Sequence, residues 1–202
     1  MPENAMPAVE ITYFDRPGKK NTEELMDAVS LCLDRTGTKT IVIASNSGET
    51  ALKAIERWPD SCSKLVVVTS HAGFSGEGML DMDSDMEAKI EHSGAKLVRA
   101  SHILSGIERS FTKKFGGVSR VEVVSETLRT LFGQGMKVCV EITVIAADSG
   151  AIRCGDEEIV VIGGTGEGAD TACVVRPAHA NDFFKFEIRE IVAMPRQKRG
   201  GR

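Results

Sequence analysis

Short runs of consecutive apolar residues alternate with amphipathic stretches along most of this chain. The runs at 40–44 and 65–69 are too short for helices, and apolar runs without alternation are typical of strands buried on both faces. The amphipathic stretches repeat their apolar positions with a period near 3.6 residues, which predicts helices. We therefore expect strands at 40–44, 65–69, 95–98, 137–147, 158–162, 172–175 and 186–192, and helices at 21–36, 48–57, 83–92, 101–112 and 119–132.

The order of these elements predicts a fold class. Alternating strands and helices are typical of a three-layer α/β sandwich with a mainly parallel sheet, and the strand-rich end of the chain is expected to add antiparallel edges. In the first helix, Asn21 and Glu24 have capping-box spacing and Gly37 suits the C-terminal end. We see no internal repeat, linker or low-complexity segment in the 202 residues. One domain is therefore expected, with flexible ends at 1–8 and 196–202.

Composition narrows the classes of function. A net charge of −4 argues against a nucleic-acid partner, and no aromatic residue interleaves the basic tail. No apolar run approaches the roughly 20 residues that span a bilayer, and the start shows no secretory signal, so we expect no membrane partner. The 5 cysteines include no Cys-x-x-Cys pair, which predicts neither a metal site nor a disulfide framework and fits a reducing cytoplasm.

The loop after the first expected strand carries the clearest candidate chemistry. Free amides at the start of a helix, together with the positive end of the helix dipole, favour a bound anion such as a phosphate. In this loop Ser47 is a candidate N-cap, and Gly48 would let a ligand approach the backbone. An ordinary cap after a strand would have the same pattern, so both interpretations stand. The candidate binding residues are Ser45, Asn46, Ser47, Gly48, Glu49 and Thr50.

Two further loops follow expected strands. Ligands of open α/β sheets bind outside the carboxyl ends of the strands, so these loops would share one edge. In the first, His71 and Gly73 adjoin Phe74, which would stack on a flat ring. A loop histidine without a role is an equally plain interpretation of His71, and an isolated Phe is more often a core residue. His102, after the third strand, is a weaker candidate for the same edge. The second loop is rich in glycine and contributes Gly163, Gly164, Thr165, Gly166, Gly168, Asp170 and Thr171.

The glycine-rich loop does not fit a dinucleotide-binding motif. That motif requires a strand, then the glycines, then a helix, whereas residues 172–177 have the pattern of a strand. What remains is either a turn between two strands or a loop that closes over a ligand.

Several blocks of the sequence resemble one known family. The core from Ser47 to Ala51 is similar to the phosphate loop of the pyruvate kinase C-terminal (alpha/beta) domain. The blocks at 71–74, 133–138 and 163–172 resemble the stand-alone archaeal and bacterial members of that family. The resemblance, over about residues 21–176, implies a pyruvate kinase C-terminal domain-like fold. It also implies an effector phosphate at the loop 45–50, under the glycine-rich loop. The stand-alone members imply flavin mononucleotide (FMN) as the cofactor.

From these observations we expect a small-molecule-binding protein that holds a phosphorylated ligand, with FMN suggested by the resemblance. Pyruvate kinase activity is not expected, because that chemistry belongs to a separate barrel domain. Glu49 stands where many pyruvate kinases carry a basic residue, so a monophosphate suits the loop better than a sugar bisphosphate. One alternative is an enzyme that uses the flavin or a phosphorylated metabolite, with His71 or His102 moving protons. Another is a regulatory module whose ligand alters a homo-oligomer.

Overall fold

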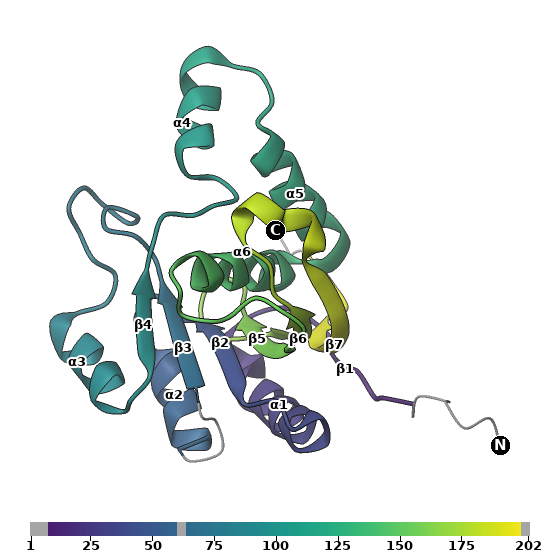
Figure 1. The fold of residues 1–202 in the computed structure, drawn as a ribbon. Helices are drawn as coiled ribbons and strands as arrows, with labels where there is room; N and C mark the ends of the chain where they lie inside the picture. Colours follow the sequence, from purple (N-terminus) through teal and green to yellow (C-terminus); the bar gives the residue numbers. More distant parts are fainter. Residues whose placement is uncertain (1–7, 60–63, 199–202) are drawn as a thin grey trace.

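The computed structural model describes residues 8–59 and 64–198, which form a mixed sheet covered by helices on both faces (Figure 1). The sheet has seven strands in the order β1-β7-β6-β5-β2-β3-β4. Strands β2 to β5 and the pair β1–β7 are parallel, whereas β6 is antiparallel to both of its neighbours. The strands are β1 Thr12–Phe14, β2 Thr40–Ala44, β3 Lys64–Thr69, β4 Lys96–Arg99, β5 Ile159–Gly163, β6 Thr171–Arg176 and β7 Glu187–Pro195.

The helices complete three layers. Helices α1, α2 and α3 lie on one face of the sheet, while α6 lies on the other face with α5 packed outside it (Figure 1). This arrangement confirms the predicted α/β class with a mostly parallel sheet. The helices are α1 Thr22–Thr36, α2 Glu49–Arg57, α3 Ser84–His92, α4 Gly106–Phe115, α5 Arg120–Phe132 and α6 Gln134–Asp148, with 3-10 turns at η1 Lys19–Asn21 and η2 Ala180–Lys185.

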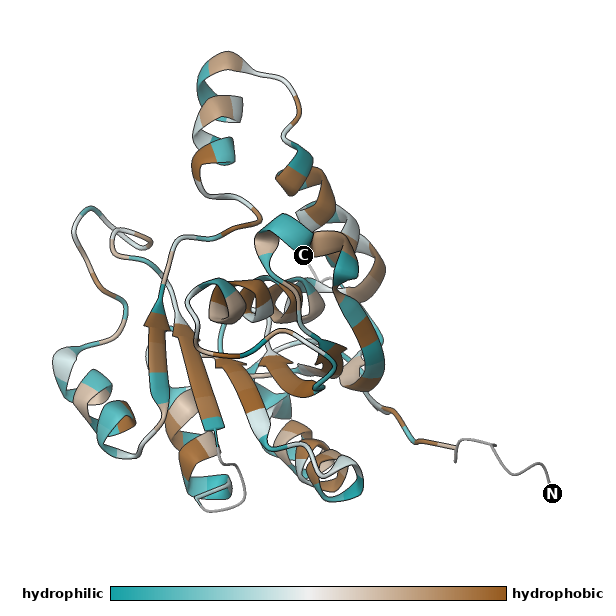
Figure 2. Cartoon of the chain, in the orientation of Figure 1, coloured by the Kyte–Doolittle hydropathy of each residue, from teal (hydrophilic) through white to brown (hydrophobic). Residues whose placement is uncertain are grey.

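The central strands are buried on both faces, which explains their unbroken apolar sequences. In β2, Ile41 and Ile43 face the core beneath α1 and α2, whereas Val42 faces the core beneath α6. Successive side chains of a strand point to opposite faces, so two covering layers require apolar residues at every position. Figure 2 shows the result as hydrophobic colour along β2 and β3 beyond their first residues, Thr40 and Lys64.

The predicted strand at 137–147 is wrong, because this segment lies within helix α6. Helix α6 lies between the sheet and the outer elements α5 and η2, and its residues from Gly135 to Ala147 are all buried except Val138. A helix covered on all sides has no polar face, so its sequence loses the period of 3.6 residues that marks an amphipathic helix. Its β-branched residues then favour the strand interpretation.

Two smaller predictions about the elements also need correction, and one strand was missed. Asn21 precedes α1 but makes no side-chain cap there; its side-chain Nδ2 donates to the carbonyl of Arg16 at 2.8 Å. Helix α4 begins at Gly106 rather than at residue 101, and residues 101–105 form a loop. Strand β1 was not predicted at all. By contrast, Gly37 ends α1 in a left-handed conformation, as predicted.

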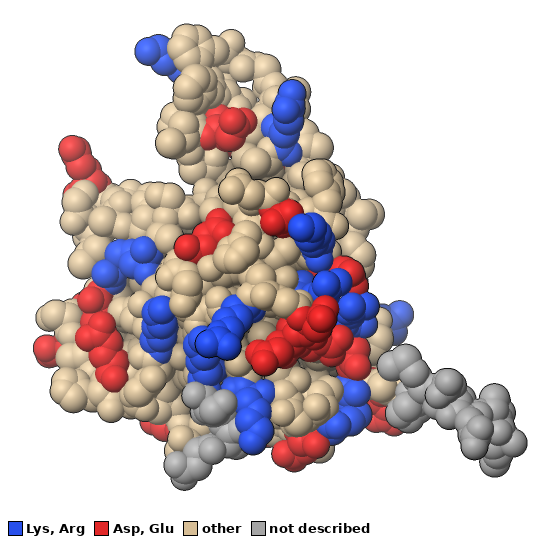
Figure 3. Space-filling model, in the orientation of Figure 1, with Lys and Arg blue, Asp and Glu red and all other residues tan. Residues whose placement is uncertain are grey.

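The ends of the chain are only partly described. Residues 1–7 and 199–202, which belong to the segments expected to be flexible, lie outside the described residues. Within the described part, the amides of Arg196 and Gln197 donate to the carbonyls of Phe14 and Asp15. Acidic and basic side chains are intermixed on the face shown in Figure 3. Among the described helices, none has the length and apolar character needed to cross a bilayer.

Candidate functional site

A cavity of about 580 Å³ opens at the carboxyl ends of β2 and β3. Strands β2 and β5 are neighbours in the sheet. After β2 the chain continues to β3 on one side, whereas after β5 it continues to β6 on the opposite side, so the strand order diverges between β2 and β5. Open α/β sheets bind their ligands at such points. The cavity is lined by Ala44, Ser45, Asn46, Ser47, Glu49, Thr50, Val68, Thr69, Ser70, Phe74, Ser75, Asp81, Ala100, His102, Gln134, Lys137, Val138, Glu141, Ile142, Ile145, Gly164, Gly166, Glu167 and Gly168.

Two serine hydroxyls accept hydrogen bonds from backbone amides in the first turn of α2. The buried Ser45 hydroxyl accepts from the amide of Ala51 at 3.2 Å, and the Ser47 hydroxyl lies 3.5 Å from the amide of Glu49. The N-cap of α2 is Gly48, so the prediction of Ser47 in that role is wrong. Among the described residues no acceptor meets the amide of Thr50, which remains available to an anion at this helix end.

Gly48 lacks a side chain because α3 packs closely against it, and not because a ligand approaches its backbone. Its φ of 93° lies in the left-handed region. A Cβ at this position would lie 2.8 Å from Sδ of Met86 in α3, and closer still to Cγ of that residue. Gly48 itself does not line the cavity. The glycine therefore lets the start of α2 lie against α3, which corrects the expectation from the sequence.

The negative charge of Glu49 is balanced by a nearby lysine. Lys19 Nζ lies 2.7 Å from Oε2 of Glu49 and 3.6 Å from Oε2 of Glu167 in the glycine-rich loop. The hydrogen bond to Lys19 and its charge lower the pKa of Glu49, so this carboxylate stays ionised and paired. Lys19 thus connects the two loops on either side of the cavity.

The glycine-rich loop packs closely against the start of α1. A Cβ at Gly168, whose φ is 69°, would lie 2.6 Å from Oγ1 of Thr22. The same Thr22 hydroxyl accepts from the amide of Ala169 at 3.0 Å. Gly164 and Gly166 line the cavity together with Gly168. This loop and the β2–α2 loop therefore meet at one cavity, as the sequence predicted.

Four residues predicted in the glycine-rich segment do not line the cavity. Asp170 is fully buried, and it accepts from the amide of Gly18 at 2.9 Å and from the hydroxyl of Thr171 at 2.9 Å. Gly163 lies against α6, where a Cβ would be 3.0 Å from Sγ of Cys139. Thr165 is not among the lining residues either. Asp170 and Thr171 thus hold the turn before α1 against the start of β6, rather than facing a ligand.

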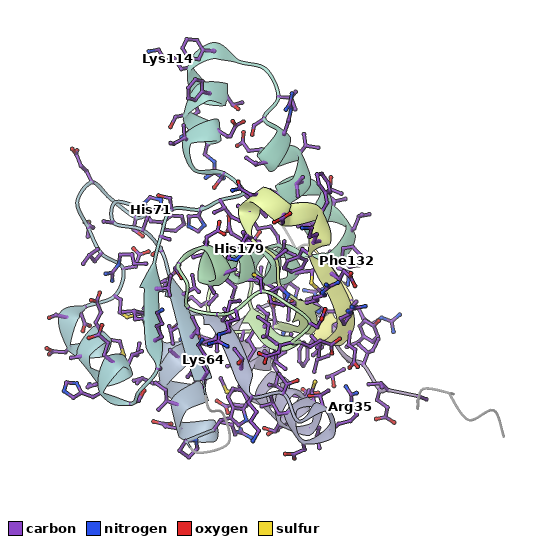
Figure 4. All side chains as sticks on the ribbon, viewed as in Figure 1. Arg35, Lys64, His71, Lys114, Phe132 and His179 are labelled. Atoms are coloured by element: carbon purple, nitrogen blue, oxygen red, sulfur yellow. The ribbon has the colours of Figure 1, made fainter. Side chains whose placement is uncertain are left out.

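The loop after β3 brings three rings together. Phe74 lines the cavity and lies 5.0 Å from the ring of His102, centre to centre. His71 lies edge-on to both, at 5.8 Å from Phe74 and 5.6 Å from His102, and Figure 4 places it beside the tops of β3 and β4. Gly73 closes this loop by donating its amide to Met79 at 2.7 Å. His71 and Gly73 support Phe74 without lining the cavity themselves.

A buried charged cluster from α6 lines the cavity and was not among the predicted binding residues. Glu141 accepts from Lys137 Nζ, from the amide of Leu104 at 3.0 Å, and from Nδ1 of His102 at 3.0 Å. Burial alone would raise the pKa of Glu141, but the bond to His102 and the charge of Lys137 bring it down to about 2. Burial lowers the pKa of Lys137, against the opposing effect of Glu141.

The bond to Glu141 decides which ring nitrogen of His102 carries a hydrogen. Only an N–H can bond to the ionised Glu141, so Nδ1 carries a hydrogen, and Nε2 is the acceptor in the neutral ring. Nε2 is buried and has no partner among the described residues. A carboxylate that orients a histidine in this way is one part of a general base, which also requires the accepting nitrogen to reach the ligand. The signal in the sequence was the spacing of Lys137 and Glu141 by four residues within an otherwise apolar run.

The carboxylate of Asp148 lies away from the cavity. It ends α6, and its Oδ1 lies 3.0 Å from Nδ1 of His179. His179 is not among the residues that line the cavity.

The architecture defines the class of this protein: an α/β domain with one helix N-terminus and one glycine-rich loop at a cavity beside the sheet. The family model of the pyruvate kinase alpha/beta domain matches residues 23–175, which is more than half of the chain. The protein therefore belongs to this family, as the sequence blocks suggested. The matched segment runs from α1 to β6, so it contains both loops and the charged cluster of α6.

Proposed function

We propose that this protein binds a phosphorylated small molecule, specifically FMN, in the cavity between the β2–α2 loop and the glycine-rich loop. The main support for the proposal is that both loops line one cavity, and that this cavity lies where the strand order diverges between β2 and β5. Its volume of about 580 Å³ suits a ligand of this size, since small-molecule sites are commonly about 300–1,000 Å³.

The chemistry of the lining residues supports a ligand with one anionic end and one flat end. At the β2–α2 loop, the amide of Thr50 and the hydroxyl of Ser47 would hold the phosphate at the start of α2. Near the β3 loop, the rings of Phe74 and His102 would contact the flavin ring. Lys137 adds a buried positive charge to the same cavity. Bound FMN would supply one- or two-electron chemistry that side chains cannot provide.

Comparison of FMN with riboflavin tests the phosphate contact directly. Charge-assisted hydrogen bonds contribute about 1.5–3 kcal/mol each, so riboflavin should bind at least about tenfold more weakly than FMN. Titration calorimetry measures both affinities, and visible absorption of the freshly purified protein would reveal bound flavin. Equal affinities would contradict the phosphate site, and the absence of FMN binding would contradict the proposal as a whole.

A matched pair of variants locates the site. Ser47→Glu places a carboxylate at an exposed position of the α2 start, where it would repel a phosphate. Ser84→Glu makes the same change at the exposed start of α3, outside the cavity. We expect only Ser47→Glu to reduce FMN affinity, by at least about tenfold. An equal effect of the two variants would exclude the β2–α2 loop as the phosphate site.

The Glu141–His102 pair favours a second candidate function, an enzyme that moves a proton to or from the bound ligand. Glu141 orients His102, which lines the cavity beside Phe74. In an assay of FMN-dependent oxidation of a reduced nicotinamide with an added acceptor, His102→Asn should lower the turnover rate even when FMN is saturating. Turnover that does not change in the variant, or that is undetectable in the wild-type protein, would leave binding as the function.

A further inference from the structure

Helix α4 and the start of α5 project from the body of the protein as an arm, which we define as residues 106–123 (Figure 1). None of the residues of α4 is buried. A helix of 10 residues is only marginally stable in water by itself, so its stability must come from packing on something else. The neighbouring helix α5 accounts for part of that packing.

Two polar contacts join α4 to α5 through Glu122. Arg109 Nε lies 3.5 Å from Oε1 of Glu122, and the hydroxyl of Thr112 donates to Oε2 of the same residue at 3.0 Å. These bonds orient α4 on α5 through its polar side. The opposite side of α4 therefore faces away from α5, and that side carries the large apolar residues.

The exposed side of α4 is an apolar row at helical spacing. Ile107, Phe111 and Phe115 are 77%, 59% and 71% exposed, and Val118 in the following turn is 82% exposed. Residues at i, i+4 and i+8 form one of the ridges by which helices pack together. Contiguous exposed apolar surface of this kind marks an interaction site.

We propose that the arm is a self-association surface, and that its partner is a second copy of this chain. The apolar row is symmetric about Phe111, because Ile107 precedes it by four residues and Phe115 follows it by four. Two copies of α4 related by a two-fold axis at Phe111 would pack antiparallel. Each Ile107 would then lie at the level of Phe115 of the other copy. A two-fold interface requires such a self-complementary surface.

The charges of α4 agree with an antiparallel pair. Glu108 lies in its first turn, and Lys113 and Lys114 lie in its last turn, with Lys114 at the far end in Figure 4. Within the described residues, Glu108 and Lys113 form no ion pair. Antiparallel packing places the acidic end of one helix beside the basic end of the other, which also aligns the two helix dipoles favourably.

The apolar area is sufficient for a specific, modest interface. Aromatic side chains bury about 150–250 Å² each, so burial of this row and Val118 in both copies would remove on the order of 1,000 Å² from water. Specific interfaces begin at about that size. A dimer that dissociates on dilution is therefore the expected form.

Sedimentation equilibrium of the purified full chain over a range of concentrations provides the test. We expect a monomer–dimer equilibrium for the wild-type protein. Phe111→Asp places two like charges at the axis and should raise the dimer dissociation constant by at least about 100-fold, with an unchanged circular dichroism spectrum. Leu31→Asp, on the body in α1 and also 72% exposed in the wild-type protein, is the matched control and should have no effect.

Disulfide crosslinking tests the antiparallel packing of the two α4 helices separately. With Phe111→Cys the two introduced thiols would lie near the axis, so mild oxidation should give a covalent dimer, whereas Leu31→Cys should not. A wild-type monomer at all concentrations, or a dimer that persists in Phe111→Asp, would overturn the proposal. Binding of a monomeric protein to anionic lipid vesicles through the arm would also overturn it, by showing that the partner is a membrane surface.

Discussion

Replacement of Glu141 by Gln tests the buried cluster that lines the cavity. Glu141 and Lys137 are almost fully buried, so removal of the carboxylate charge leaves the ammonium without its ion-pair partner. A pKa of about 2 in place of 4.5 corresponds to about 3 kcal/mol in favour of the charged form. Loss of one partner of a buried pair costs about 3–5 kcal/mol. We therefore expect Glu141→Gln to lower the free energy of unfolding by about 3 kcal/mol at pH 7.

A set of variants separates the stability contributed by the Lys137–Glu141 ion pair from that of the other hydrogen bonds to Glu141. Lys137→Met should cost less than Glu141→Leu, because Glu141 keeps its bonds to His102 and to the amide of Leu104. The double variant Lys137→Met with Glu141→Leu should recover at least about 2 kcal/mol relative to Glu141→Leu alone, since no unpaired charge remains buried. Urea denaturation of the ligand-free protein measures all of these values.

A surface pair provides the control. Glu23 pairs with Lys53 and Arg57 at exposed positions of α1 and α2. Exposed pairs contribute about 0–1 kcal/mol, so Glu23→Gln should have little effect on stability. If Glu141→Gln cost no more than Glu23→Gln, the inference that the cluster is ionised and buried would be refuted.

The dependence on pH gives an independent check of the same reasoning. The pKa of Glu141 is lower in the folded protein than in the unfolded chain. Its contribution to stability is therefore complete above pH 4.5 and disappears as the pH falls toward 2. The difference in stability between the wild-type protein and Glu141→Gln should shrink across that interval. A constant difference would mean that the carboxylate does not titrate as proposed.

Three further predictions address the loops around the cavity. Gly48→Ala should destabilise the protein by about 1–3 kcal/mol in urea denaturation, because its φ is 93° and a Cβ would collide with Met86. Asp170→Ala should cost about 1–3 kcal/mol, since the partly buried amide of Gly18 loses its acceptor, but the folded variant should bind FMN with unchanged affinity. In hydrogen exchange, FMN should protect the amides at 45–50 and 164–168 together, and protection of only one loop would exclude a shared site.

Local sequence patterns were sufficient for much of the fold. The strands β2 and β3 and the helices α1 and α2 were predicted near their observed bounds. The apolar runs arise because helices cover both faces of the sheet, and the amphipathic patterns arise because each helix packs one face on the sheet. Most α/β proteins share this arrangement. The convergence of the β2–α2 loop and the glycine-rich loop was also predictable, because both follow strands that end at the same edge of the sheet.

The sequence alone therefore determined the alternation of strands and helices, the fold class and two of the loops at the cavity. Only the tertiary structure decided that residues 137–147 form a helix, because burial on every side removes the periodicity by which a helix is recognised. It also decided which side chains face the cavity. His102 and Glu141 are 39 residues apart in the chain, and they meet because α6 lies across the sheet beside the loop after β4. Contacts between such distant residues depend on the packing of whole elements, which no short pattern encodes.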